Sequence, residues 1–535
     1  MDALLIKNGT LYDGLGHPAT AGDLLVDGGI IRRIGQNLQA DRPCRIVDAA
    51  GKVVCPGFID IHRHCDMKLI GPDDFGGQEL LQGITTTVVG NCGISLTPAP
   101  RDPDACRALR DFQEPVLGAV PATAPADYTG YLTALKARRQ PLNVAAMPGT
   151  GSIRVTVKGF ASTPYTPAES ARARALVEQA LALGAPGVSL GIMYLPECYT
   201  TLEEYARILE PVGQAHRVLT VHIRAEGNRM VESVAEAIEI ARRAGCALEI
   251  SHFKSCGKPN WRRDIHRAIG LIERARAEGQ DVTCDFYPYD SGSTALTTML
   301  PPDMLHGDLP GALAYLGTAE GVREFTEKSR RPYADWDNFA LLLGWDRILI
   351  SSVRQEKFRP MLGMSITEAS ETFGYPTPES LAADLMHVDE GKTAIINRSM
   401  CQEDIDTVAR LPYSTVISDA IYAETDSPHP RMYGAFPKIL REYVRERGLL
   451  SLEQAIHKMT GLPAARMGLV GRGVLREGYA ADLLVFDPAL FRDNATYSAP
   501  TRPATGLSLA LVNGQIAVEN GSRTTACAGK VLQVE

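Results

Sequence analysis

The sequence predicts an α/β protein in which a (β/α)8 barrel carries a small β-sandwich domain built from both chain ends. Three observations support this fold class. Strands alternate with helices along residues 57–465, as a parallel sheet requires. Short strands separated by turn residues fill 1–56, and the same pattern returns over 466–535. We therefore expect the two terminal segments to pair into one domain beside the barrel.

The first 56 residues contain a strong hairpin signal. Asp27-Gly28-Gly29 separates the apolar runs 23–26 and 30–34, and turn residues of this kind favour a two-stranded hairpin. The other strands expected in this segment lie at 4–6, 10–12, 45–48 and 52–54. Residues 1–56 are accordingly the N-terminal part of the small β domain.

Residues 57–465 contain the repeated strand–helix units. Strands are expected at 58–61, 85–90, 143–147, 187–190, 219–223, 247–252, 282–286, 347–350, 393–396 and 415–418. Helices with apolar residues at helical spacing are expected at 168–183, 203–212, 231–244 and 262–278. About eight such units predict a barrel.

One segment interrupts this rhythm, at about 291–385. Pro301-Pro302 and Arg331-Pro332-Tyr333 break the alternation there, and Trp336 and Trp345 follow. Long insertions of this kind commonly cover an active site, so we expect a lid-like segment. After 466 the strands expected at 482–486 and 509–518 complete the small domain.

Composition excludes several classes of partner. The 535 residues carry a formal charge of −8 and a sequence pI near 5.9, which argues against nucleic acid and against an anionic membrane surface. No run of about 20 apolar residues is present, and the N-terminus lacks the basic, apolar pattern of a secretory signal. Eleven scattered cysteines fit reduced thiols, so a cytoplasmic protein is expected. The oligomeric state stays open.

Polar residues suited to metal binding follow several of the expected strands. His62 and His64 lie two residues apart at the end of the first strand, so their imidazoles share one face. The others, each at the corresponding end of another unit, are Cys92, His222, His252 and Asp419. Because catalytic side chains of barrels lie at these strand ends, the six are expected to converge. Any one of them alone would be an ordinary buried or capping residue.

The ligand types indicate zinc. Thiolate and imidazole together favour Zn²⁺ over Mg²⁺ or Ca²⁺. Cys92, His222 and His252 would form one tight site with an open position for water. His62, His64 and Asp419 would complete a second, weaker site, or Asp419 would act as a proton carrier.

These motifs resemble the N-acyl-D-amino-acid deacylases (D-aminoacylases) of the amidohydrolase superfamily. The resemblance rests on the motifs His62-Arg63-His64, Gly90-Asn91-Cys92-Gly93, His222-Ile223-Arg224-Ala225-Glu226-Gly227, Ser251-His252-Phe253-Lys254 and Ser418-Asp419. It implies an amidohydrolase-type barrel and zinc-dependent hydrolysis of an N-acyl-D-amino acid to a carboxylate and the free D-amino acid. It also implies Asp419 as general base and then acid, Lys254 and Tyr287 as α-carboxylate contacts, Tyr194 beside the acyl carbonyl, and Arg431 as a further carboxylate contact.

The chain departs from this resemblance near the expected site. Arg63 and Cys65 replace smaller or acidic residues, and the loop at 424–427 is longer. Family members that prefer acidic side chains are expected to place an arginine soon after Tyr287-Pro288-Tyr289, and 294–301 contains none. Neutral or hydrophobic side chains are therefore favoured.

Two other functions remain to be weighed. A cyclic-amide hydrolase of the hydantoinase or dihydroorotase type would need a metal-bridging lysine on a barrel strand, and Cys92 stands in that place. A non-catalytic scaffold that keeps the metal for stability would be expected to lose Asp419 or a metal ligand, and all are present.

Overall fold

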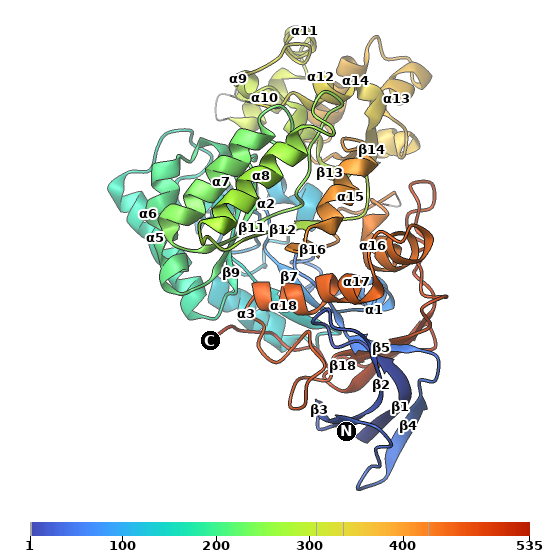
Figure 1. Cartoon of the computed structure of the whole chain (residues 1–535). Helices are drawn as coiled ribbons and strands as arrows, with labels where there is room; N and C mark the ends of the chain where they lie inside the picture. Colours follow the sequence, from blue (N-terminus) through green and yellow to red (C-terminus); the bar gives the residue numbers. More distant parts are fainter. Residues whose placement is uncertain (1–2, 306–307, 335, 426) are drawn as a thin grey trace.

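Eight parallel strands form the centre of the molecule in the computed structural model, which describes residues 3–305, 308–334, 336–425 and 427–535 (Figure 1). They occur in two hydrogen-bonded groups with the orders β6-β7-β8 and β9-β10-β11-β12-β16. Isolated parallel bridges, Gly149 with Ser189 and Arg63 with Ala420, join the two groups at both edges. The strands are β6 (Phe58–Asp60), β7 (Ile84–Val89), β8 (Asn143–Ala146), β9 (Gly187–Gly191), β10 (Val218–His222), β11 (Ala247–Ile250), β12 (Val282–Phe286) and β16 (Ser414–Val416). The predicted α/β class is confirmed.

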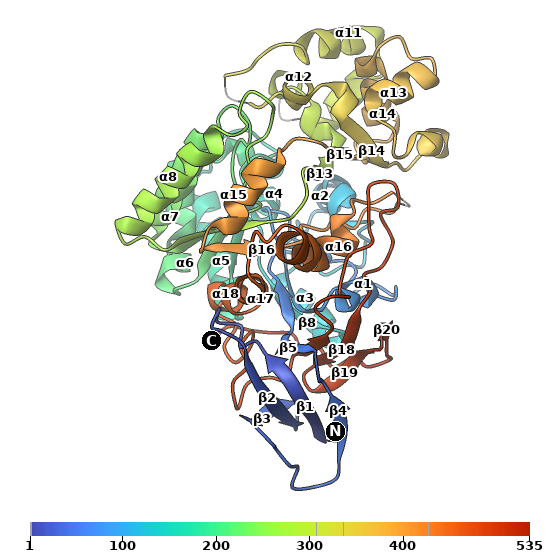
Figure 2. The ribbon, with the colours of Figure 1, turned by 45° about the vertical axis from the view of Figure 1, so that its right-hand side comes forward.

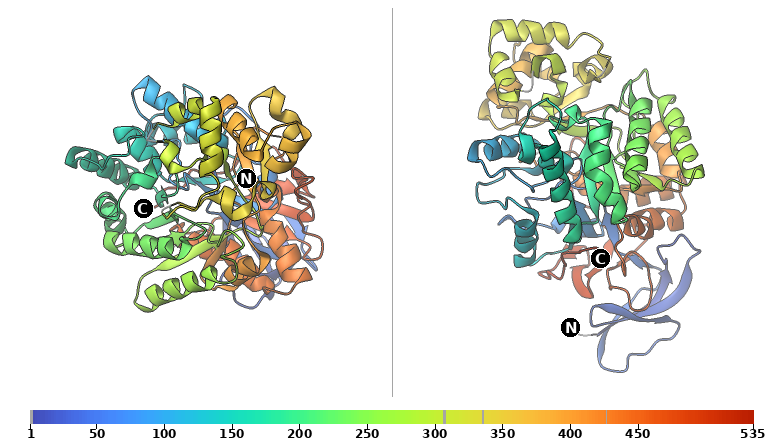
Figure 3. Two further views of the ribbon diagram at one scale, coloured as in Figure 1. Left: turned by 90° about the horizontal axis from the view of Figure 1, so that it is seen from above. Right: turned by 90° about the vertical axis from the view of Figure 1, so that its left-hand side faces the viewer.

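Helices follow the parallel strands and cover them on the outside, as the view from above shows (Figure 3). Thr166 and Thr201 begin two of these helices with complete capping boxes. In each box the threonine hydroxyl accepts a hydrogen bond from the backbone N–H of a glutamate three residues later, and the glutamate side chain accepts one from the backbone N–H of the threonine. The helices are α1 (Gly77–Leu81), α2 (Pro103–Leu117), α3 (Tyr128–Ala137), α4 (Thr150–Lys158), α5 (Pro167–Ala182), α6 (Leu202–Gln214), α7 (Met230–Ala244), α8 (Asp264–Ala277), α15 (Gln402–Arg410), α16 (Arg431–Lys438), α17 (Leu452–Met459) and α18 (Gly461–Arg466). No helix in the described ranges is both long and apolar enough to cross a membrane.

The two chain ends meet in one nine-stranded sheet (Figure 2). Strand β5 joins them, because it pairs with β1 on one side and with β17 on the other. Residues alternate between the faces of β17: Leu483 and Val485 pack into the core of the small sheet, whereas Leu484 and Phe486 pack into the main core. The strands are β1 (Ala3–Leu11), β2 (Thr20–Asp27), β3 (Ile30–Gly35), β4 (Cys44–Asp48), β5 (Val53–Pro56), β17 (Leu483–Phe486), β18 (Leu507–Val512), β19 (Gln515–Glu519) and β20 (Ser522–Arg523).

A separate unit with its own apolar core lies between β12 and α15, in the upper part of Figure 1. Its three strands, β13 (Gly292–Ala295), β15 (Ala394–Asn397) and β14 (Ile348–Ser352), form an antiparallel sheet in that order. Its α-helices are α9 (Pro302–Leu305), α10 (Leu309–Tyr315), α11 (Ala319–Lys328), α12 (Phe339–Leu343), α13 (Ile366–Thr372) and α14 (Pro378–Val388). We call residues 292–397 the insert.

The insert corrects one prediction. The strands expected at 347–350 and 393–396 as parallel units of the barrel are β14 and β15, and they are antiparallel strands of the insert instead. Short apolar strands have the same sequence pattern in either sheet, so the pattern predicts the strand but not its partner. Since β15 pairs with β13, the insert extends beyond residue 385.

Candidate metal centre and active site

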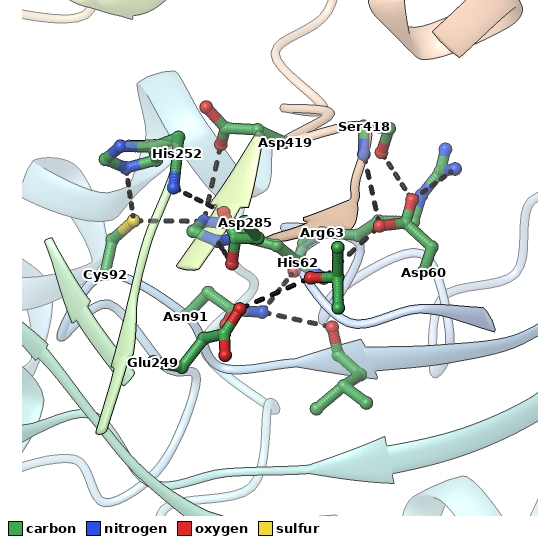
Figure 4. A network of polar contacts seen from close by, with 12 residues as sticks. Asp60, His62, Arg63, Asn91, Cys92, Glu249, His252, Asp285, Ser418 and Asp419 are labelled. Atoms are coloured by element: carbon green, nitrogen blue, oxygen red, sulfur yellow. Dashed lines mark hydrogen bonds and ion pairs between the residues drawn. The ribbon is translucent and has the colours of Figure 1, made fainter. Parts of the chain in front are cut away.

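The six residues expected to converge do lie together at the carboxyl ends of the parallel strands. Figure 4 shows four of them, His62, Cys92, His252 and Asp419. His62 and His64 follow β6, Cys92 follows β7, and His222 ends β10. His252 follows β11, and Asp419 follows β16. All six are buried, and each is less than a tenth exposed.

Their ligand atoms form two overlapping triads that share one sulfur. One triad is Cys92, His222 and His252, and the other is His62, His64 and Cys92; within each, the ligand atoms lie within 4.8 Å of one another. Cys92 Sγ is 3.1 Å from His62 Nε2 and 3.5 Å from His252 Nε2. A thiolate between imidazoles on both sides is a donor set that suits Zn²⁺.

Burial prepares these groups for a cation. Burial lowers the pKa of His62 to about 4 and holds the pKa of His222 and His252 well below its usual value, so the imidazoles are neutral and keep a free lone pair. Burial, with Asp419 nearby, raises the pKa of the Cys92 thiol well above its usual value. A thiolate at this depth therefore needs a metal cation beside it, and the residues present fit one.

Three of the site residues lie in sharp turns that follow their strands. Cys92, His252 and Asp419 have positive φ angles of 54°, 35° and 50°, in the left-handed region that residues other than glycine seldom adopt. Gly191 allows β9 to approach closely, because a Cβ there would lie 1.9 Å from the carbonyl oxygen of Cys92. Uncommon backbone angles that cluster at one point are typical of functional sites.

Two buried carboxylates that the sequence analysis did not single out hold the imidazoles in place. Glu226 Oε1 lies 3.1 Å from His252 Nδ1 and 2.5 Å from Lys254 Nζ. Asp285 accepts a hydrogen bond from the backbone N–H of His252, and its other oxygen lies 3.6 Å from His62 Nδ1. Carboxylates in this position orient metal-binding histidines. The sequence does contain a feature that could have indicated Asp285, because it is the one acidic residue in the otherwise uncharged strand β12.

Asp419 faces both the histidines and an arginine. Its Oδ1 lies 3.5 Å from His62 Nε2 and 3.4 Å from His64 Nε2, and its Oδ2 lies 2.8 Å from Arg431 Nη1. Burial alone would raise the pKa of this carboxyl, but Arg431 and the histidines hold the pKa well below its usual value. The carboxylate is therefore ionised and available to accept a proton.

The four residues expected to contact the substrate surround the same place. Lys254, Tyr287 and Tyr194 line a cavity together with five of the six site residues, all except His62. The Tyr194 ring lies 4.7 Å from the His222 ring. Arg431 lies behind this lining, with its guanidinium 4.6 Å from the centre of the Tyr287 ring. Within the described residues, Tyr287 Oη and the Arg431 Nε and Nη2 groups have no hydrogen-bond partner.

The departures Arg63 and Cys65 do not reach this cavity. Arg63 is fully buried and forms ion pairs with Asp60 at 3.2 Å and Glu79 at 3.0 Å, and it also donates to the Tyr422 hydroxyl. Cys65 is likewise fully buried, and neither residue lines the cavity. Arg63 is thus part of a structural network behind the candidate metal ligands.

The longer loop at 424–427 contacts the insert. The backbone oxygens of Glu424 and Ser427 accept hydrogen bonds from Ser352 and Ser351 of β14, at 3.3 Å and 2.9 Å. Residue 426 of this loop lies outside the described residues. The loop therefore ties the insert to the end of the parallel strands where the candidate metal ligands lie.

Comparison with known proteins identifies the family to which this chain belongs. A model described as the amidohydrolase family matches residues 45–210 and 411–518. The chain is 36% identical to a D-aminoacylase from Alcaligenes xylosoxydans xylosoxydans, across 99% of this chain and 97% of that protein. The chain belongs to the N-acyl-D-amino-acid deacylase family of amidohydrolases. Members of this family are hydrolytic enzymes.

Two further relatives differ in substrate and lie at similar distance. An N-acyl-D-aspartate deacylase from the same organism is 35% identical, across 98% of this chain and 93% of that protein. The crystal structure of an N-acyl-D-glutamate deacylase from Bordetella bronchiseptica, complexed with zinc and a phosphonate inhibitor, has a TM-score of 0.83 at 31% identity and covers 99% of both chains. A D-hydantoinase structure, with a TM-score of 0.57 at 16% identity, shares the fold alone. Identity to these deacylases therefore does not distinguish their substrates.

Proposed function

We propose that this protein hydrolyses the amide bond of N-acyl-D-amino acids with the help of bound zinc, releasing a carboxylate and the free D-amino acid. The observation that carries the proposal is the pair of triads sharing Cys92, with the ionised Asp419 beside them. Cys92, His222 and His252 would hold the tight zinc, and His62 and His64 would complete a second, weaker site. Zinc bound there would supply an acidic water and polarise the amide carbonyl.

The residues of the chain would move the protons. Asp419 Oδ1 faces the histidine nitrogens, so it can accept a proton from the attacking water and return it to the leaving nitrogen. An amide nitrogen leaves only when it is protonated, so this second transfer is required. The ion pair with Arg431 on Oδ2 keeps the other oxygen of this carboxylate fixed. Tyr194 would lie beside the acyl carbonyl.

The α-carboxylate of the substrate would lie against the donors that lack partners. Tyr287 Oη and the Nε and Nη2 groups of Arg431 are buried donors without hydrogen-bond partners among the described residues, and Lys254 brings a cation to the same side. Buried donors of this kind are costly unless an acceptor reaches them. A carboxylate would satisfy them through charge-assisted hydrogen bonds.

The lining of the cavity favours neutral or hydrophobic side chains on the amino acid. Ile94, Val116, Phe339 and Ile421 contribute apolar surface to it. Lys254 is the one lysine or arginine among its described lining residues, and the α-carboxylate would engage it. A second carboxylate on the substrate would therefore lack a cation. No observation favours the cyclic-amide hydrolase, because Cys92 takes the place of a bridging lysine.

The barrel, the insert and the small β domain would each have a separate part in this reaction. We infer that residues 57–465 act as one metal-dependent (β/α)8 barrel, with the insert as a lid over its active end. Residues 1–56 and 466–535 would form the small β domain against the opposite end. This arrangement would bury the site and leave the insert free to shape the entrance.

A substrate screen tests the proposal. The zinc-loaded enzyme would be assayed against matched N-acetyl-D- and N-acetyl-L-amino acids, with elemental analysis of the same sample. Hydrolysis confined to the D series, by protein that retains zinc, is the expected result. Asp419→Asn is the control, because it removes the proton carrier and leaves both triads in place. Equal hydrolysis of both series, or full activity in the variant, would contradict the proposal.

A further inference from the structure

We propose that His429 is a positioning residue for Arg431, and that its imidazole fixes this arginine where it meets both Asp419 and the α-carboxylate of the substrate. The inference rests on the proposed function and adds a residue to it. His429 lies two residues before α16 and is 3% exposed. It does not line the cavity, so it would act through Arg431 rather than on the substrate.

Both ring nitrogens of His429 have a backbone partner. The N–H of Arg431 donates to Nδ1 at 3.0 Å, so Nδ1 keeps its lone pair. The ring proton is therefore on Nε2, which lies 3.0 Å from the backbone oxygen of Ser291 and donates to it. Burial, with Arg431 nearby, holds the pKa of His429 well below its usual value, in agreement with a neutral ring. The imidazole thus joins the residue before the insert to the first residue of α16.

The bond to Arg431 satisfies a donor at the start of a helix. The first N–H groups of a helix have no partner within the helix. In α16 the N-cap residue is Pro430, whose side chain makes no capping hydrogen bond. Nδ1 of His429 supplies an acceptor for the N–H of Arg431 instead. This bond fixes the backbone from which the Arg431 side chain extends.

A displaced Arg431 would disturb two parts of the reaction at once. Its side chain is fully buried, and Nη1 lies 2.8 Å from Asp419 Oδ2. Its Nε and Nη2 groups are the donors that would receive the α-carboxylate. Charge-assisted hydrogen bonds are strong but depend on distance and angle. A shift at the start of α16 would therefore weaken substrate binding and also release the carboxylate of Asp419.

The ring of His429 also packs against aromatic side chains, and this contact is the competing explanation for its presence. The rings of Tyr289 and Tyr497 lie edge to face with it, at 5.3 Å and 5.4 Å between centres. Such contacts are favourable for any aromatic side chain. A variant that keeps the ring and a variant that keeps the acceptor therefore distinguish packing from positioning.

Two substitutions give opposite expectations. His429→Asn removes the ring but keeps an acceptor, because an asparagine side chain commonly accepts from the backbone N–H two residues later. His429→Phe keeps the packing and has no acceptor. For the zinc-loaded enzyme, His429→Asn should keep the KM for N-acetyl-D-leucine within about threefold of the wild type, whereas His429→Phe should raise it at least about tenfold, as for the loss of a hydrogen bond to a charged group. The kcat of His429→Phe should fall as well.

His457→Phe is the matched control. Nδ1 of His457 lies 2.8 Å from the backbone oxygen of Gly14, in a contact between α17 and the turn after β1. The variant loses a comparable histidine–backbone bond away from the site. Its KM and kcat should equal those of the wild type.

KM is the deciding measurement. Partial unfolding reduces the amount of active enzyme, which lowers the apparent kcat and leaves KM unchanged. A folded His429→Phe with the wild-type KM would overturn the positioning role. A KM of His429→Asn at least about tenfold above that of the wild type would overturn it as well, and this second result decides the matter if His429→Phe does not fold.

The wild type separates this inference from the proposed function. If the wild type hydrolyses N-acetyl-D-leucine and the variants behave in either of these opposing ways, only the role of His429 fails. If the wild type hydrolyses no N-acetyl-D-amino acid, the proposed function fails and the role of His429 falls with it.

Discussion

Glu249 allows a quantitative test of the protein interior that needs no substrate. This residue of β11 is fully buried, with Thr415 Oγ1 donating to Oε1 at 3.3 Å and Arg466 Nε 3.5 Å from Oε2. Burial, with Asp285 nearby, raises the pKa of the Glu249 carboxyl from its usual 4.5 to about 8. Between these values the folded protein holds a proton that the unfolded chain has released.

The sign of the pH effect follows from this difference. Because the native state binds the extra proton, the free energy of unfolding falls as the pH rises from the unfolded to the folded pKa, and it levels off above the folded value. Each pH unit within this interval changes stability by about 1.4 kcal/mol. Between about pH 5.5 and about pH 8.5, Glu249 alone should lower the free energy of unfolding by about 3 kcal/mol.

Glu249→Gln removes the titrating group and keeps its shape. Relative to the wild type, the free energy of unfolding of the variant should rise by about 3 kcal/mol across this pH interval. Urea unfolding followed by tryptophan fluorescence, at one fixed zinc concentration, measures the difference. Glu239→Gln is the control, since Arg242 and Arg243 lower the pKa of Glu239 to about 2, so that it is ionised throughout. If the difference between Glu249→Gln and the wild type is the same at both pH values, the reasoning is refuted.

Three further predictions concern the metal centre and its surroundings. Cys92→Ala removes a ligand from both triads, so zinc retained after desalting should fall by more than the tenfold to hundredfold loss typical of an outer-shell change; wild-type zinc content and turnover would contradict the shared-ligand role. Lys254→Met should raise the KM for N-acetyl-D-leucine by on the order of tenfold or more, since a charge-assisted hydrogen bond is lost, and an unchanged KM would remove Lys254 from the carboxylate site. Arg63→Met leaves Asp60 and Glu79 buried without their cation and should lower the free energy of unfolding in urea by about 3–5 kcal/mol. Arg107→Met, at an exposed ion pair, is the control and should lower it by about 0.5 kcal/mol or less. Equal losses in the two variants would show that the buried ion pairs of Arg63 do not stabilise the fold.

The convergence of the candidate site residues could be predicted from the sequence because these residues follow the ends of apolar strands. His62, Cys92, His222 and Asp419 each follow or end an apolar strand, and parallel strands bring their carboxyl ends together. The N-terminal hairpin could also be predicted, because its turn residues and apolar runs are adjacent in the chain. Strands β2 and β3 form the antiparallel pair that this pattern predicts.

What could not be predicted depended on contacts between distant segments. The strands β14 and β15 have the composition of barrel strands, and only their antiparallel pairing places them in the insert. Arg63 was expected near the site because it lies between His62 and His64 in the sequence. Adjacent residues at a strand end point in opposite directions, so its side chain reaches Glu79 and Tyr422 instead.

The nine-stranded sheet has a consequence for synthesis of the chain on the ribosome. Strand β5 leaves the ribosome early, but its partner β17 is made roughly 430 residues later. At ordinary elongation rates this interval lasts on the order of tens of seconds. During that time β5 presents an unpaired edge that can recruit a strand from a neighbouring nascent chain. Premature termination before β17 would leave this edge open permanently, so aggregation of truncated chains should begin at the small β domain.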